Sequence, residues 1–133
     1  MTFIKNVDTI KANIFLAFKT CSKYKSDKLG GNQMISSLHI KNIGIIEDLS
    51  VDLNNGLNVL TGETGAGKTL IIDSLQIISG GRFSKEMIRK GETNSFVELC
   101  MYNPKSEYAV DGNIIVSREI NINGKNMCKI NGR

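Results

Sequence analysis

The amino-acid sequence predicts an α/β fold in which a mixed β-sheet accompanies one main helix. Three observations support this prediction. Apolar and polar residues alternate over residues 35–53, as they do in strands that are buried on one face. A glycine-rich stretch then leads into an apolar segment with helical periodicity. From residue 95 onward, apolar and β-branched runs alternate with turn signals.

The first β region predicts two strands, a turn and a third strand. In SSLHIKNI, Leu38 and Ile40 alternate with polar residues, and IIEDLSVDL at 45–53 alternates in the same way. The tripeptide NNG at 54–56 is a turn signal. The next run, LNVLTG at 57–62, is expected to form a short strand that leads directly into the glycine-rich stretch.

The glycine-rich stretch matches the phosphate-loop pattern G-x-x-x-x-G-K-[ST] at every fixed position. Its glycines let the backbone pass close to phosphate oxygens, and the N-terminus of the following helix favours anions. Lys68 is expected to contact the β- and γ-phosphates, and the Thr69 hydroxyl to coordinate Mg²⁺. The residues predicted to bind the phosphates of ATP are Gly62, Glu63, Thr64, Gly65, Ala66, Gly67, Lys68 and Thr69.

The helix that follows is expected over KTLIIDSLQII, with Gly80 and Gly81 ending it. Its predicted buried side consists of Leu70, Ile71, Leu75 and Ile78, with a contribution from Ile72. The basic residues after the helix are interpreted as a solvated face rather than a phosphate or DNA contact; they are Arg82, Arg89 and Lys90.

The second β region predicts strands over SFVELCMY and NIIVSREI, separated by a turn that contains Pro104. Asn123-Gly124 occupies the position of a tight hairpin turn, after which KNMCKING returns as a further strand. The result is a hairpin-rich β layer beside the phosphate loop, which differs from the plain βαβ arrangement of small kinases.

Charge and composition give little support for other classes of site. The net charge is +4, but residues 1–33 contain six Lys and two Asp, and residues 34–133 are balanced at eleven basic and eleven acidic residues. Net charge is therefore no argument for DNA binding by the second segment. The three cysteines are far apart and suggest neither zinc nor disulfides, and the single histidine, His39, is assigned a structural role. No apolar run approaches the roughly 20 residues of a transmembrane helix, so no membrane association is expected.

The first 33 residues differ from the rest of the chain. Phe3, Val7 and Ile10 begin a helical stripe that is followed by a lysine-rich linker with Gly-Gly. Because Leu29-Gly30-Gly31 can be encoded with a ribosome-binding sequence just upstream of Met34, we hypothesise that the natural protein starts at Met34. The expected domain is therefore residues 34–133, preceded by an extension over residues 1–33.

Residues 34–133 resemble the N-terminal part of the RecN family, bacterial SMC-like ATPases of DNA double-strand-break repair. The resemblance is carried by Leu38, Ile40 and Asn42 in the first strand, by TGETGAGK, by GGR after the helix and by MIRKGE at 87–92. Residues 1–33 have no counterpart in it. The resemblance implies the P-loop NTPase fold of ABC/SMC-type heads, here as the N-terminal lobe only, in the bacterial cytoplasm and associated with the nucleoid.

The family also implies partners that the chain does not contain. Its heads are assembled from N- and C-terminal segments joined by a long coiled coil, and ATP is bound between two heads of a homodimer that handles DNA. By the same resemblance, Lys41 and Asn42 are expected to lie close to the nucleotide. The chain has no Walker B strand, no Ser-Gly-Gly signature and no Gln loop. We therefore expect the parent protein to hydrolyse ATP and this chain to turn over little or none.

Three alternative interpretations remain open. RecF and other SMC-like heads favour Asn-Gly inside the loop, where this chain has Glu63-Thr64-Gly65. ABC transporter subunits usually carry Ser-Gly-type loops and an aromatic residue that stacks on adenine, for which the sequence offers no clear candidate. A non-catalytic nucleotide-binding or scaffold fragment is the third alternative.

Overall fold

The computed structural model describes residues 34–54, 56–62 and 67–133. The predictions made for residues 1–33 and for Glu63, Thr64, Gly65 and Ala66 lie outside the described residues. The elements in chain order are β1 (Met34–Ile43), β2 (Ile46–Asp52), α2 (Lys68–Ile78), the 3₁₀ turn η1 (Lys85–Met87), β3 (Asn94–Tyr102), β4 (Asn113–Asn121) and β5 (Asn126–Ile130).

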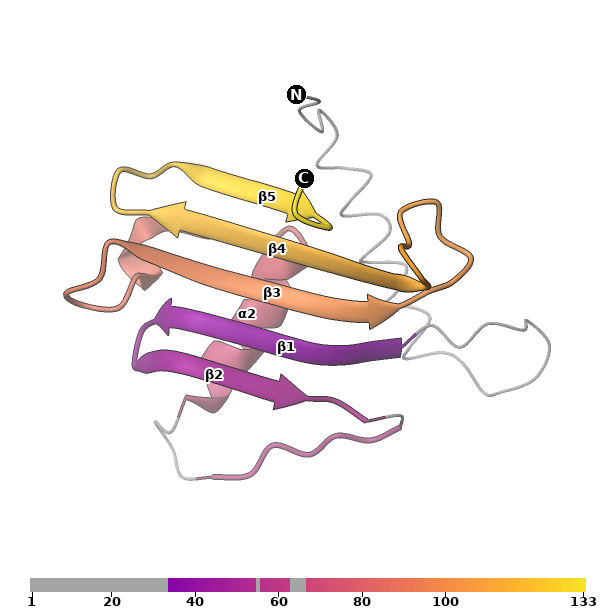
Figure 1. Cartoon of the computed structure of the whole chain (residues 1–133). Helices are drawn as coiled ribbons and strands as arrows, with labels where there is room; N and C mark the ends of the chain where they lie inside the picture. The colour runs from indigo at the N-terminus through magenta and orange to yellow at the C-terminus, as the bar shows by residue number, and fades with distance from the viewer. Residues whose placement is uncertain (1–33, 55, 63–66) are drawn as a thin grey trace.

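The five strands form one sheet in the order β2-β1-β3-β4-β5, and every neighbouring pair is antiparallel. Helix α2 crosses behind one face of this sheet and leaves the other face uncovered by any helix of the described residues (Figure 1). The predicted combination of a sheet with one main helix is confirmed. Among the described residues, no helix has the length and apolar character needed to cross a membrane.

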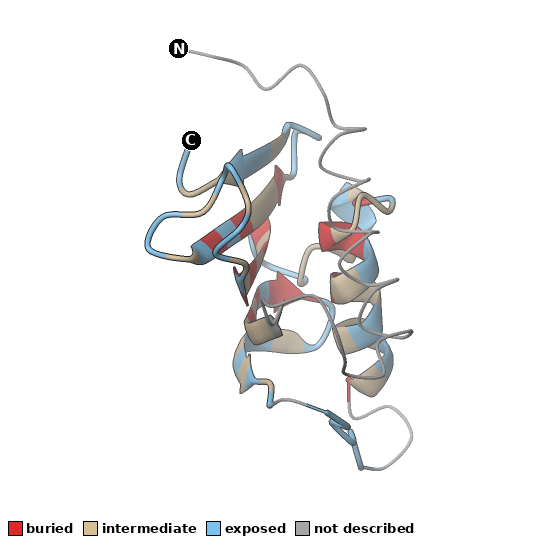
Figure 2. Ribbon diagram, turned by 90° about the vertical axis from the view of Figure 1, so that its right-hand side faces the viewer, coloured by how far each residue is buried: buried red, intermediate tan, exposed pale blue. Residues whose placement is uncertain are grey.

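The core lies between the sheet and α2, as the buried residues in Figure 2 show. Burial alternates along β3, and its inward residues pair with inward residues of β1 and β4: Leu99 faces Leu38 on one side and Val116 on the other. Period-two alternation therefore separates a covered face from an open face, as the sequence predicts. The buried apolar residues are Leu38, Ile40, Ile43, Ile77, Ile78, Phe83, Val97, Leu99, Met101, Ile114, Val116 and Ile120.

Helix α2 buries most of the predicted side: Ile78 is buried as expected, and Ser74 and Ile77 are buried in addition to the predicted residues. The fully buried Ser74 marks the line of closest approach to the sheet, and Ile77 and Ile78 are buried one turn later. Leu70, Ile71 and Leu75 are partly buried against the core, as expected. The assignment of Ile72 is wrong, because its side chain is 47% exposed. At 3.6 residues per turn, Ile72 lies about 200° around the axis from Ser74 and so points away from the sheet.

The strand expected over residues 57–62 does not form. The segment is irregular, and Leu57 and Val59 are 89% and 69% exposed. An apolar run becomes a strand only when a neighbouring strand pairs with it, and none of the described strands pairs with this segment in the sheet. The turn expected at 54–56 falls partly on residue 55, which is outside the described residues.

The predicted turns at the helix end and in the second β region are confirmed. Helix α2 ends at Ile78, and Gly80 follows with φ +95°. Gly81 donates to the Gln76 carbonyl, and a Cβ at this position would lie 2.7 Å from the Gln76 oxygen, so only glycine fits. In the β4–β5 hairpin, Gly124 has φ +78° and its N–H donates to the Asn121 carbonyl over 2.8 Å.

Candidate nucleotide-binding site

Gly67 and the first turn of α2 form the described end of the phosphate loop. Gly67 is the N-cap residue, with φ +90° in the left-handed region, and its carbonyl accepts a hydrogen bond from the Ile71 N–H over 3.2 Å. A residue with a Cβ would be strained at this φ, which explains the glycine of the pattern at this position. Helix α2 thus begins at a residue whose backbone conformation favours glycine.

The electrostatics of this helix start favour an anion. The first N–H groups of a helix have no carbonyl partner within it, and the helix dipole adds partial positive charge there. The first turn of α2 contains no acidic residue. The Lys68 ammonium donates to the Gly62 carbonyl and so joins the two ends of the predicted loop. Thr69, the predicted Mg²⁺ ligand, is exposed.

The β1–β2 turn, defined as residues 42–46, includes the last two residues of β1 and the first residue of β2, and it packs against the helix start. A Cβ built on Gly67 would lie 3.7 Å from side-chain atoms of both Ile45 and Ile46. A Cβ on Gly44 would lie 2.9 Å from a terminal carbon of Leu70, closer than real Cβ contacts. Gly44 therefore allows the turn to approach α2 closely.

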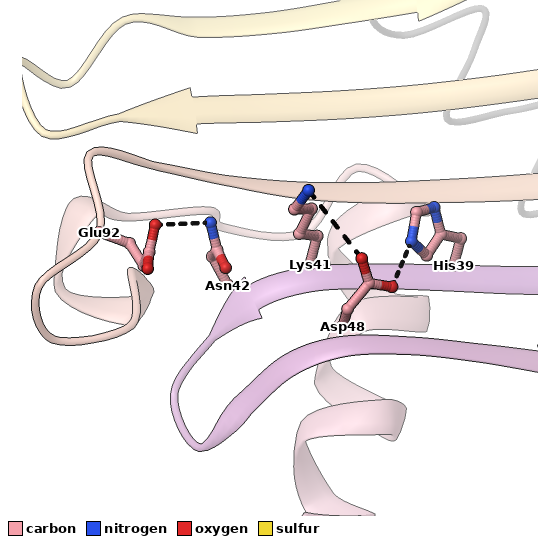
Figure 3. Close-up of polar contacts among 5 residues, drawn as sticks. All are labelled: His39, Lys41, Asn42, Asp48 and Glu92. Atoms are coloured by element: carbon pink, nitrogen blue, oxygen red, sulfur yellow. Dashed lines mark hydrogen bonds and ion pairs between the residues drawn. The ribbon is translucent and has the colours of Figure 1, made fainter.

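Lys41 and Asn42 are consecutive residues, but the structure places their side chains in different surroundings. Lys41 is exposed on the open face of the sheet, where its ammonium lies 3.9 Å from Asp48 (Figure 3). Asn42 is buried and donates from Nδ2 to the Glu92 carboxylate over 3.1 Å. Both border a hollow of about 210 Å³ that also includes Asn94, Phe96 and Glu119. Their expected proximity to nucleotide stays a prediction.

His39, to which the sequence assigns a structural role, contacts two neighbouring side chains on the open face of the sheet. Its Nε2 lies 2.9 Å from an Asp48 oxygen, and its ring meets Phe96 edge-on at 5.8 Å between centroids (Figure 3). Among the described residues, no group of three or more His, Cys, Asp or Glu side chains could hold a metal ion.

The interpretation of the basic residues after α2 as a solvated face is wrong for Arg89. Arg82 and Lys90 are exposed, but the Arg89 guanidinium donates to the Ile45 carbonyl over 2.7 Å and approaches the Gly44 carbonyl at 3.5 Å. It also lies 4.0 Å from a Glu47 oxygen. Arg89 thus helps hold the β1–β2 turn. Its partners are more than forty residues away in the sequence, so local pattern gave no signal of this role.

The described donor set suits a phosphate group with a divalent cation. It combines a helix N-terminus without acidic residues, a lysine ammonium and an exposed threonine hydroxyl next to it in the chain. Phosphate oxygens accept from N–H groups and ammonium, and hard cations such as Mg²⁺ prefer oxygen ligands and substrate phosphates.

Comparison with known proteins identifies the family. Residues 37–131 match the family model described as AAA domain. The chain belongs to this AAA domain family. Within the family it is similar to the protein of Halalkalibacterium halodurans named DNA repair protein RecN, with 42% identity over 111 residues. That match covers 75% of this chain and 20% of the relative. The expected resemblance to RecN is therefore confirmed, and the chain spans about a fifth of the length of the curated relatives it matches.

Solved structures show the same fold for this AAA domain. The Smc head domain from Pyrococcus yayanosii superposes with a TM-score of 0.68 at 17% identity, covering 77% of this chain and 23% of the other. The recombination mediator protein RecF in its RecF-ATP structure superposes with a TM-score of 0.63 at 16% identity, covering 76% and 27%. These likenesses confirm the predicted P-loop ATPase-head fold.

Proposed function

We propose that the chain is the N-terminal lobe of an ATP-binding head in a RecN-like protein of DNA double-strand-break repair. The observation that carries this proposal is the phosphate-loop sequence at the start of α2, in a chain 42% identical to a RecN protein over 111 residues. The geometry of Gly67 and the absence of acidic residues in the first turn support phosphate binding at this helix start.

Each residue of the site has a proposed role. The Lys68 ammonium contacts the β- and γ-phosphate oxygens. Backbone N–H groups at the start of α2 donate hydrogen bonds to oxygens of the β-phosphate. The Thr69 hydroxyl holds Mg²⁺, which when bound neutralises charge on the β- and γ-phosphate oxygens. Residues 63–66 complete the loop, and Lys41 and Asn42 lie near the nucleotide.

The site in this chain binds nucleotide without hydrolysing it efficiently. Transfer of the γ-phosphoryl group to water requires a residue that positions and activates the water, in addition to the phosphate contacts. The sequence supplies Lys68 and Thr69 but no Walker B carboxylate. Hydrolysis is therefore a property of the whole RecN-like protein, in which a second lobe supplies the missing groups.

Exposed apolar side chains support the proposed second lobe. Leu57 and Val59 are 89% and 69% exposed, and Ile72 on the outer side of α2 is 47% exposed. Exposed apolar side chains of this size are typical of a surface that another segment covers. The proposed partners are the C-terminal lobe, a second head in a homodimer and DNA, in the bacterial cytoplasm and nucleoid.

RecF-like function is the weaker alternative. The RecF structure shares the fold but only 16% sequence identity, whereas the RecN relative is 42% identical. Fold alone does not specify function, so the higher identity favours RecN.

Equilibrium binding of fluorescent ATP to the 133-residue chain in the presence of Mg²⁺ tests the proposal. We expect saturable binding that Lys68→Ala weakens at least about a hundredfold, because the charged contact to phosphate is lost. Lys105→Ala, an exposed lysine in the β3–β4 loop, is the matched control and should bind as the unaltered chain does. Equal binding by all three proteins, or none by any, would overturn the proposed phosphate site. If the unaltered chain hydrolyses ATP and Lys68→Ala abolishes that hydrolysis, the proposal that a second lobe is required for hydrolysis is wrong.

A further inference from the structure

We propose that the hydrogen bond between Asn42 and Glu92 is a positioning contact for the nucleotide site. The hydrogen bond holds the β1–β2 turn, residues 42–46, in place. The turn then positions Gly67 and the start of α2. Neither side chain needs to touch the nucleotide for this role. The inference rests on the nucleotide binding proposed above, and its test separates the two.

Asn42 has the conformation and burial of a residue with a specific local function. It is 5% exposed and has φ +55°, in the left-handed region. Residues other than glycine avoid this region, and asparagine tolerates it best. Its side-chain amide points across to Glu92, which accepts from Nδ2 over 3.1 Å (Figure 3). Glu92 is exposed, but Asn42 is buried, so loss of this partner removes a hydrogen bond from a side chain that has little contact with solvent.

The segment at residues 87–95 holds the turn from one side. The Gly44 N–H donates to the Met87 carbonyl over 3.0 Å, and the Arg89 N–H donates to the Asn42 carbonyl over 2.9 Å. The buried Ser95 hydroxyl donates to the same Asn42 carbonyl. The hydrogen bond from Asn42 to Glu92 is a further contact between the turn and this segment, and it is made by the side chain of Asn42.

The opposite side of the same turn meets the phosphate-binding end of α2. Ile45 and Ile46 pack over Gly67, and Gly44 sits directly against Leu70. These contacts join the position of the turn to that of the helix start, although Ile45 itself is 61% exposed. A shift of the turn therefore moves the residue that sets the entry into the helix, although Asn42 lies twenty-five residues before Gly67 in the chain.

Asn42→Gly is the informative single change, because glycine accepts φ +55° and only the side-chain contact is lost. We expect the Kd for fluorescent ATP with Mg²⁺ to rise about three- to tenfold, the usual range for residues that act through a neighbouring element. Asn42→Asp should weaken binding further, since two carboxylates then face each other. The double change Asn42→Asp with Glu92→Gln restores a hydrogen bond with reversed polarity and should recover most of the affinity.

The chain contains a matched control. Asn94 donates from Nδ2 to Glu119 over 2.8 Å, which is the same chemistry on the open face of the sheet. This pair lines the same hollow as Asn42, but none of its hydrogen bonds reaches the β1–β2 turn or α2 among the described residues, so it separates an effect of the hollow from an effect of the turn. Glu119→Ala should therefore leave the Kd unchanged, even where it lowers the melting temperature. An unchanged Kd for Asn42→Gly, or a failure of the double change to recover affinity, overturns the positioning role.

Hydrogen exchange provides a readout that needs no nucleotide. The Ile71 N–H bonds to the Gly67 carbonyl over 3.2 Å and reports on the helix start. We expect Asn42→Gly to speed exchange at Ile71 several-fold while exchange in β4 stays as before, and Glu119→Ala to leave Ile71 unchanged. Unaltered exchange at Ile71 in Asn42→Gly refutes the inference. Loss of all ATP binding by the unaltered chain would instead refute the proposed function, and the exchange result would still decide the positioning contact.

Discussion

Arg118 on β4 connects the sheet to the C-terminal end of α2. Its guanidinium donates through Nη1 to the carbonyls of Ile77 and Gly81, over 2.8 and 2.6 Å, and through Nε to the Asn126 side chain over 3.1 Å. It also lies 5.8 Å from the centre of the Phe83 ring. The last turn of α2 contains no basic residue of its own, so Arg118 supplies the positive charge that a helix C-terminus favours.

The cost of removing this side chain follows from its contacts. Hydrogen bonds that involve a charged group contribute about 1.5–3 kcal/mol each, but part of the sum is offset because burial of the guanidinium costs solvation. That burial lowers the pKa of Arg118 below its ordinary value. Without Arg118, the Ile77 carbonyl keeps a hydrogen bond from the Gly80 N–H at 3.1 Å. The loss of hydrogen bonding is therefore larger at the Gly81 carbonyl. We expect Arg118→Met to lower the free energy of unfolding by about 2–3 kcal/mol.

Urea unfolding followed by circular dichroism measures this change, and the thermal midpoint should fall by roughly 10–20 °C for a domain of this size. Arg82→Met is the matched control, because Arg82 carries the same charge near the same helix end but is exposed. It should change stability by less than about 0.5 kcal/mol. A loss below about 0.5 kcal/mol for Arg118→Met would refute the reasoning, since the helix end would then be stable without the cross-sheet donor.

Two further substitutions test the close approach at the site and the exposed segment before it. Gly44→Ala should destabilise the chain by about 1–2 kcal/mol, because its φ is +54° and the new Cβ would lie 2.9 Å from Leu70. A urea midpoint equal to that of the unaltered chain would contradict this packing. Val59→Lys should change the stability of the chain by less than about 0.5 kcal/mol, because Val59 is 69% exposed. A loss above about 1 kcal/mol by the same assay would show that Val59 is buried in solution.

The sequence predicts the strands and the helix because each follows a local rule. Alternation identifies β1 and β2, and apolar and β-branched runs between turn signals identify β3 and β4. The Asn123-Gly124 turn identifies the last hairpin, and Gly80-Gly81 identifies the helix end. The phosphate-loop pattern also predicts its own setting at a helix N-terminus, which the structure reproduces at Gly67. These features depend on residues within a few positions of one another.

The wrong predictions concern residues whose environment is set by distant parts of the chain. Helix α2 has apolar residues on nearly all sides, so periodicity alone does not separate the exposed Ile72 from the buried Ile77. The run at 57–62 has the composition of a strand but no described partner to pair with. Arg118 and Arg89 donate to carbonyls forty-one and forty-four residues away, and no spacing rule connects such positions.

The two ends of α2 are held by different parts of the sheet, and this bears on how the site is built. The β1–β2 turn packs against the start of the helix at Gly67 and Leu70. Arg118 from β4 binds its end at Ile77 and Gly81. A helix fixed at both ends can translate or tilt little along the sheet, because either motion would break contacts at one end. Within the described part of the chain, both ends of the helix are therefore positioned by the antiparallel sheet, and Ile72 on the other side of the helix is 47% exposed. The proposed nucleotide binding would then depend on the contacts within this lobe, and the proposed hydrolysis on what covers the exposed side of the helix.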